Sequence, residues 1–249
     1  MSTLIFTSSV GSSIKSNDNK PDEDGYYTQN FGTIGVANTS GIVYEITGEV
    51  RDLFADDSPL LKRLGSGYLR SEQGHPKKLP GMTNVDYINR ILKIEEKSIC
   101  GHIKEIQIME NLQGPGTFTI VGKIRPAGPY ASSLKDDLEN PNSNTAFSIR
   151  SLVDQRIENG VIIRTLRTIV TWDFVDSPGI STANKLNSVG LEEDLIEIDT
   201  TDTDEVNSIV ASLEDMGDVG TENDIGIRKE VLKELSLCKG NNCIYRDWK

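Results

Sequence analysis

The feature that most constrains the fold is a pair of long β-rich stretches joined by Asn159-Gly160. Residues 161–175 are rich in Ile, Val and Thr, residue types that favour strands, and residues 145–156 before them are also expected to form a strand. An Asn-Gly pair between two such stretches is typical of a tight hairpin turn, because both turn positions require positive φ. The sequence therefore predicts a long antiparallel hairpin, which Pro178 ends.

The remaining pattern predicts an α+β domain in which strands dominate. Residues 57–90 contain many Gly and Pro residues and are expected to be irregular. Apolar residues that alternate with polar ones predict strands, and apolar residues that recur every three or four positions predict helices. On this basis we expect strands at 25–36, 99–109 and 118–124, and helices at 45–54, 130–138 and 228–237.

The acidic residues are concentrated in one segment of the chain. The net charge is -12, yet residues 186–227 hold 13 acidic residues and no Lys or Arg. The rest of the chain is nearly neutral, which argues against a nucleic-acid-binding protein with a basic surface. High charge and few aromatic residues predict that this segment is largely disordered.

Four parts of the chain are expected. A flexible polar arm, with at most a short strand at 4–7, precedes a folded domain, and the acidic segment and a short helical tail follow it. The parts cover residues 1–24, 25–185, 186–227 and 228–249. No apolar run is long enough to span a membrane, and the N-terminus lacks the basic and apolar regions of a secretory signal.

The chain has three cysteines, Cys100, Cys238 and Cys243, an odd and sparse count that fits a reducing compartment. With His102 they would supply four ligands for zinc. The two pairs lie far apart in the sequence, so free thiols are the simpler interpretation. We expect no metal or other cofactor.

Histidine is scarce, and this limits the candidates for a general base to His75 and His102. His102 lies within a predicted apolar strand, where a structural role is usual. His75 lies in Gln73-Gly74-His75-Pro76, a loop shaped by Gly and Pro. Catalytic groups are concentrated on loops that a rigid scaffold positions.

Ser148 and Asp173 occupy the two strands of the predicted hairpin. Ser148 stands near the start of the first strand, and Arg150 follows it as a source of positive charge beside a developing oxyanion. Asp173 follows Trp172 near the end of the second strand. A carboxylate buried there needs a partner, and a histidine N–H, an arginine or a backbone N–H would each serve.

The order of these residues resembles that of the prohead proteases of tailed phages, which share a fold with the herpesvirus assembly proteases. The resemblance covers residues 25–183 and depends on four segments. Residues 72–76 resemble the family segment G-E-x-x-H-P, 147–150 resemble x-S-x-R, and 172–179 resemble the closing segment with an acid five residues before Pro. Residues 38–45 resemble N-x-N-x-x-x-Y-P, although Ser40 and Glu45 replace the second Asn and the Pro.

The resemblance implies a serine endopeptidase with a herpesvirus-protease-like β-barrel core and flanking helices. Ser148 would be the nucleophile, His75 the general base and Asp173 the residue that orients His75. Backbone N–H groups near Ile149 and Arg150, with the Arg150 side chain, would form the oxyanion hole.

The resemblance also implies the partners and the setting. The enzyme would act in the host cytoplasm, inside the assembling prohead, on phage scaffold and capsid proteins and on itself, and would self-associate. No nucleic acid or membrane partner is expected. Relatives favour Glu before the scissile bond, so Glu193 and Glu197 in the acidic segment are candidate autocleavage sites.

Two other functions fit parts of the sequence. The acidic segment would also suit a non-enzymatic scaffold or capsid-interior protein with a detachable arm. The cysteines and His102 would suit a zinc-stabilised binding module.

Overall fold

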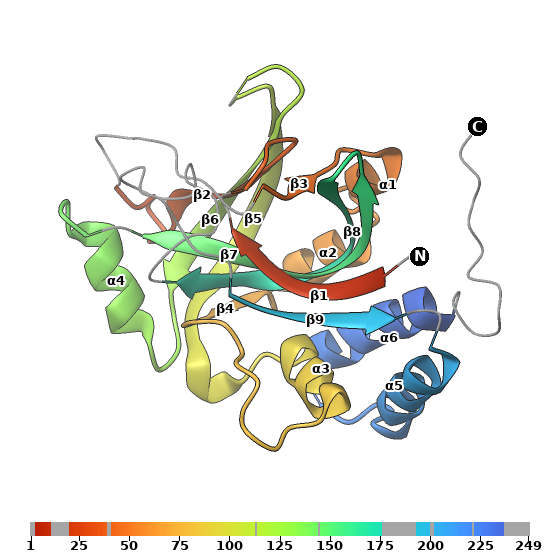
Figure 1. Ribbon diagram of the computed structural model, residues 1–249. Coiled ribbons are helices and arrows are strands. Elements are labelled where there is room, and N and C mark those ends of the chain that lie inside the picture. Colours follow the sequence, from red (N-terminus) through yellow and green to blue (C-terminus); the bar gives the residue numbers. More distant parts are fainter. Residues whose placement is uncertain are drawn as a thin grey trace.

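In the computed structural model the hairpin forms the centre of the molecule (Figure 1). The structure describes residues 3–10, 20–38, 41–112, 114–143, 145–175, 193–199, 202–220 and 222–236. Its strands are β1 (Thr3–Val10), β2 (Tyr27–Ile34), β3 (Val43–Tyr44), β4 (Arg70–Glu72), β5 (Ile99–Glu110), β6 (Phe118–Pro126), β7 (Ala146–Glu158), β8 (Val161–Val175) and β9 (Glu193–Asp199). Its helices are α1 (Gly48–Asp52), α2 (Pro59–Gly65), α3 (Asn84–Leu92), α4 (Ala131–Glu139), α5 (Thr203–Asp215) and α6 (Glu222–Ser236), with a short 3-10 helix at Glu96–Ser98.

The predicted hairpin is confirmed as β7 and β8. Their register pairs Glu158 with Val161 next to the turn and Ser148 with Asp173 near the far end. Asn159 and Gly160 have φ values of 52° and 80°, the left-handed backbone that the Asn-Gly pair predicts. The hairpin thus fixes which residues of its two strands face each other.

The described strands form two sheets, in the orders β3-β8-β7-β1-β9 and β2-β6-β5-β4. The mixed α+β, strand-rich class is therefore confirmed, but the expected β-barrel is not, because the two sheets do not close into one barrel. The alternation of apolar and polar residues along a strand indicates which side chains face the core. It does not indicate whether the strands close into a barrel. The sheets meet where Gln73 bridges Phe174 and the Gly74 N–H donates to the Phe174 carbonyl at 2.7 Å.

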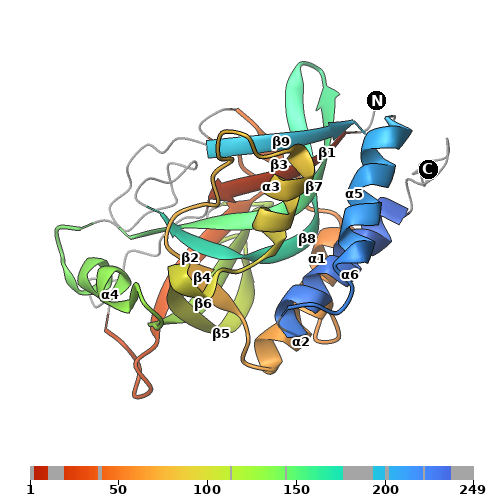
Figure 2. The ribbon, with the colours of Figure 1, turned by 90° about the horizontal axis from the view of Figure 1, so that it is seen from below.

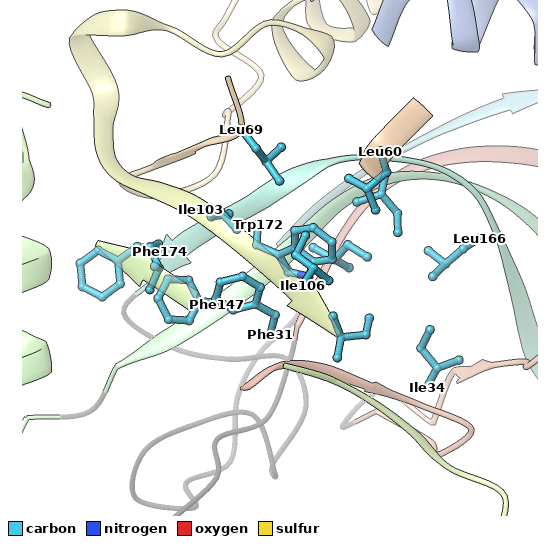
Figure 3. Close-up of a cluster of buried hydrophobic side chains, with 14 of the residues drawn as sticks. Phe31, Ile34, Leu60, Leu69, Ile103, Ile106, Phe147, Leu166, Trp172 and Phe174 are labelled. Atoms are coloured by element: carbon cyan, nitrogen blue, oxygen red, sulfur yellow. The ribbon is translucent and has the colours of Figure 1, made fainter. Parts of the chain in front are cut away.

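A layer of aromatic side chains fills the space between the two sheets (Figure 3). The Phe31 ring centroid lies 4.8 Å from that of Phe147 and 5.5 Å from that of Trp172. The Phe147 and Phe174 centroids are 6.3 Å apart. Phe147, Trp172 and Phe174 adjoin Ser148 and Asp173 in the sequence, so this layer supports the backbone of both residues.

A second core packs α3, α5 and α6 against the five-stranded sheet (Figure 2). Ile88 and Ile91 of α3 belong to one buried cluster with Val210 and Leu213 of α5. Ile198 of β9 belongs to the same cluster. The elements β9, α5 and α6 are therefore part of the folded unit.

The prediction of disorder across residues 186–227 is wrong for the part of that segment that the structure describes. β9 pairs with β1, and α5 buries Val206, Ile209, Val210 and Leu213 on one face. The acidic residues lie between these apolar positions, and a composition averaged over the segment conceals the helical period. The predicted terminal helix exists as α6, although it begins earlier, at Glu222.

Within the arm that was expected to be flexible, the short strand at 4–7 exists and is longer, as β1, which lies between β7 and β9 in the sheet. The expectation that 57–90 is irregular is corrected, because this region contains α2, β4 and α3. Ser58 caps α2, and Thr83 with Asp86 forms a capping box on α3. These caps were visible in the sequence and mark helix starts.

Candidate active site

Asp173 and His75 form the centre of the site. Asp173 lies near the end of β8 and is fully buried. His75 follows β4 at a turn where Gly74 has a φ of 73° and its N–H is bound to the Phe174 carbonyl. The His75 Nδ1 atom lies 3.1 Å from Asp173 Oδ2. This contact favours the tautomer in which Nδ1–H donates to the carboxylate and Nε2 is left unprotonated.

Ser148 of β7 lies directly opposite Asp173 of β8. Residues paired in this way point to the same face of a sheet, with Cβ atoms about 4.5–5.5 Å apart. Ser148 is also fully buried. The structure thus brings two of the predicted site residues into contact and places the third beside them.

Arg150, two residues after Ser148, holds the Asp173 carboxylate from the other side. Its Nε donates to Asp173 Oδ2 at 2.9 Å, and its Nη2 donates to Oδ1 at 2.7 Å. The Glu72 backbone N–H also points to Oδ1, at 3.3 Å. Burial alone would raise the pKa of Asp173, but Arg150 and His75 outweigh it and keep that pKa below its ordinary value.

Two further charged residues belong to the site, and neither was predicted from the sequence to have a role there. The Glu72 carboxylate lies 3.1 Å from Arg150 Nη2 and 2.7 Å from Arg90 Nη2. Glu72 and Arg150 are buried, and Arg90 lies on α3 near the surface. Glu72 stood inside the segment that resembles the family, but no spacing linked it or Arg90 to Arg150.

The groups that were predicted to bind the oxyanion already have other hydrogen-bond partners in this structure. The Arg150 Nη1 atom donates to the carbonyls of Ile91 and Lys93, at 3.2 and 3.1 Å, so every guanidinium N–H has an acceptor. At Ile149 and Arg150, β7 pairs with β1 on one side and with β8 on the other, so the backbone groups of these residues face neighbouring strands. These contacts argue against a free oxyanion donor at either residue.

His102 has the structural role expected of a histidine in a strand. Its Nδ1 lies 2.7 Å from the Tyr26 hydroxyl, and its Nε2 lies 3.1 Å from the Gly67 carbonyl. Cys100 is buried beside Ser71. No group of potential metal ligands occurs among the described residues, and Cys238 and Cys243 lie outside them.

The candidate autocleavage residues lie in an ordered strand. β9 runs antiparallel to β1, with Glu193 opposite Ser8 and Glu197 opposite Ile5. In the described part of the chain, no helix is both long and apolar enough to cross a bilayer.

Comparison with known proteins defines the class of this protein as a peptidase. The chain belongs to the Peptidase S80 family, whose model matches residues 7–235. It is 36% identical over 207 residues to a capsid maturation protease of Pseudomonas phage phiKZ, an alignment that covers 78% of this chain and 76% of the relative. No solved structure matches it significantly.

Proposed function

We propose that this protein is a serine endopeptidase that cleaves phage scaffold and capsid proteins, and itself, during maturation of the prohead. The observation that carries the proposal is the His75–Asp173 contact beside Ser148. The name of the phiKZ relative supports the capsid as the place of action. The enzyme would act inside the assembling prohead and associate with further copies of itself.

In this proposal Ser148 Oγ attacks the scissile carbonyl while His75 Nε2 takes the hydroxyl proton. His75 Nε2 is buried and has no hydrogen-bond partner among the described residues. Asp173 holds the ring through Nδ1 and stabilises the imidazolium, and the imidazolium then protonates the leaving amine. Ser148 is fully buried, so a substrate reaches it only after the chain that covers it moves.

Self-cleavage after Glu193 or Glu197 is part of the proposal. A protease binds its substrate as an extended chain, and β9 is already extended. The backbone of β9 is paired with β1, so β9 must leave the sheet before it can be cut. Cleavage there would separate α5 and α6 from the rest of the chain.

The nucleophile is tested with a fluorophosphonate, a reagent that labels activated serines. We expect mass spectrometry to find the label on Ser148 and no label in Ser148→Ala. Ser151→Ala is the matched control, because Ser151 lies in the same strand, is equally buried and has an unpartnered hydroxyl. Labelling at another serine, or an Ser148→Ala protein that still cleaves, would refute the assignment.

Self-cleavage is tested by intact-mass analysis of the full chain beside a synthetic peptide of residues 186–203. We expect the peptide to be cut after Glu193 or Glu197 faster than the folded chain, since the peptide has no β1 partner. Both cuts should be absent with Ser148→Ala enzyme. If neither the peptide nor the chain is ever cut, the non-enzymatic scaffold interpretation becomes the better one.

A further inference from the structure

Five titratable or charged side chains form a continuous row that leads from the helix α3 to His75. Arg90 Nη2 lies 2.7 Å from Glu72 Oε2, and that oxygen lies 3.1 Å from Arg150 Nη2. Arg150 Nη2 lies 2.7 Å from Asp173 Oδ1, and Asp173 Oδ2 lies 3.1 Å from His75 Nδ1. The charges alternate in sign along the row, so each buried charge is paired.

Arg150 is the most constrained member of this row. Its guanidinium contacts both oxygens of Asp173, the Glu72 carboxylate and the carbonyls of Ile91 and Lys93. A planar guanidinium with all its donors bound has one orientation, and it transmits that orientation to the carboxylate. Asp173 Oδ2 is thereby directed at His75.

The row places charges of both signs on one side of His75. The Asp173 carboxylate contacts His75 Nδ1, and Arg150 binds that carboxylate from its other side. The Glu72 carboxylate is paired with both Arg150 and Arg90. Charged residues with no role in contacting a substrate thus surround the candidate base.

We propose that Arg150 is a positioning residue that fixes Asp173 against His75, and that its charge, offset by Glu72, sets how firmly His75 holds a proton. The catalytic part of this inference rests on the proposed function. The effect on the His75 proton depends only on the contacts of the row. The two parts can therefore fail separately.

Other titratable groups lie around the row. Glu95 lies 3.5 Å from Arg90, and Lys97 lies 3.3 Å from Glu95. The Tyr87 hydroxyl donates to the carbonyl of the residue after His75, at 2.8 Å. Burial raises the pKa of Cys100 to about 12, so its thiol is neutral at physiological pH.

The experiment is an NMR titration of the full chain with labelled histidine, in which His102→Asn assigns the two signals. Arg150→Met and Arg90→Gln each remove a positive charge, so the His75 midpoint should rise, by about one pH unit for Arg150→Met. Glu72→Gln removes a negative charge, so the midpoint should fall. Arg156→Met is the control, because Arg156 lies in the same strand but is exposed and paired with Glu45.

A second measurement separates geometry from charge. Arg150→Lys keeps the charge but loses the two-pronged contact with Asp173. We expect a His75 midpoint close to that of the wild type together with a fall in kcat/KM of about 10- to 100-fold on the 186–203 peptide.

Opposite shifts from Arg150→Met and Glu72→Gln, with none from Arg156→Met, would support the proposal. Shifts in the same direction, no shift, or full activity in Arg150→Lys would overturn it. If Arg150→Met does not fold, the directions in which the His75 midpoint moves in Glu72→Gln and in Arg90→Gln test the proposal, since Arg90 is less buried. Cleavage by Ser148→Ala would refute the proposed function and leave the titration result standing.

Discussion

Replacing Gly122 with alanine would test how tightly the aromatic layer beneath the site is packed. A Cβ at residue 122 would lie 2.1 Å from Cε2 of Phe31 and 2.5 Å from its Cδ2. The ring would have to move by about 1 Å or more to reach an ordinary contact distance of roughly 3.5 Å. Phe31 is fully buried between Phe147 and Trp172, so it has no free space to enter.

Overpacking of a well-filled core costs about 1–3 kcal/mol. We expect Gly122→Ala to lower the free energy of unfolding by that amount in urea denaturation, with an unchanged dependence on urea concentration. Cleavage activity should fall as well, because Phe147 and Trp172 immediately precede Ser148 and Asp173 in their strands.

Two variants complete this experiment. Gly48→Ala is the matched control, since a Cβ there meets nothing within 4 Å and alanine favours the helix. Phe31→Leu in the Gly122→Ala background should recover part of the loss, with a coupling energy of about 0.5–3 kcal/mol. A Gly122→Ala protein as stable as the wild type would refute the packing argument.

Three further predictions concern stability and reactivity. Asp173→Asn removes one of the two carboxylates that pair with the buried Arg150 and should cost about 3–5 kcal/mol at pH 7. Because the folded pKa of Asp173 is depressed, its contribution is present above the unfolded value of about 3.9 and is lost as the pH falls through the folded value. Urea denaturation from pH 7 to pH 3 should therefore show the difference from wild type shrinking only below about pH 4, and a constant difference would contradict this. Cys100, with its pKa raised to about 12 by burial, should not react with a thiol reagent in a folded Cys238→Ser/Cys243→Ser protein and should react in urea. Leu213→Ala in α5 should cost about 3–5 kcal/mol, whereas exposed Val219→Ala should change stability by less than about 0.5 kcal/mol. Equal effects would mean that α5 is not part of the core.

The local interactions of the chain could be predicted from the sequence. The Asn159-Gly160 turn requires positive φ at both positions, and that requirement set the register of β7 and β8. The register in turn places Ser148 opposite Asp173. The scarcity of histidine limited the choice of base to two residues, of which His75 is the one beside Asp173.

The failed predictions have a common physical cause. Charge and polarity averaged over 186–227 predicted disorder, yet a helix needs only one apolar face, and α5 presents that face to α3. The strand β1, within the arm that was expected to be flexible, is stabilised by pairing with β7 and β9. Tertiary pairing of this kind overrides local composition.

The candidate site shows the same difference between what local patterns predict and what contacts between distant parts of the chain decide. The sequence by itself determined the hairpin and limited the candidate base to two histidines, because these depend on local patterns or on a rare residue type. The roles of Ser148 and Asp173 follow from the family resemblance and stay a prediction. Only the tertiary structure decided the partners of Asp173, because β4 and α3 bring Glu72 and Arg90 to Arg150 from distant parts of the chain. A buried charge requires a partner, but sequence does not reveal which distant residue supplies it.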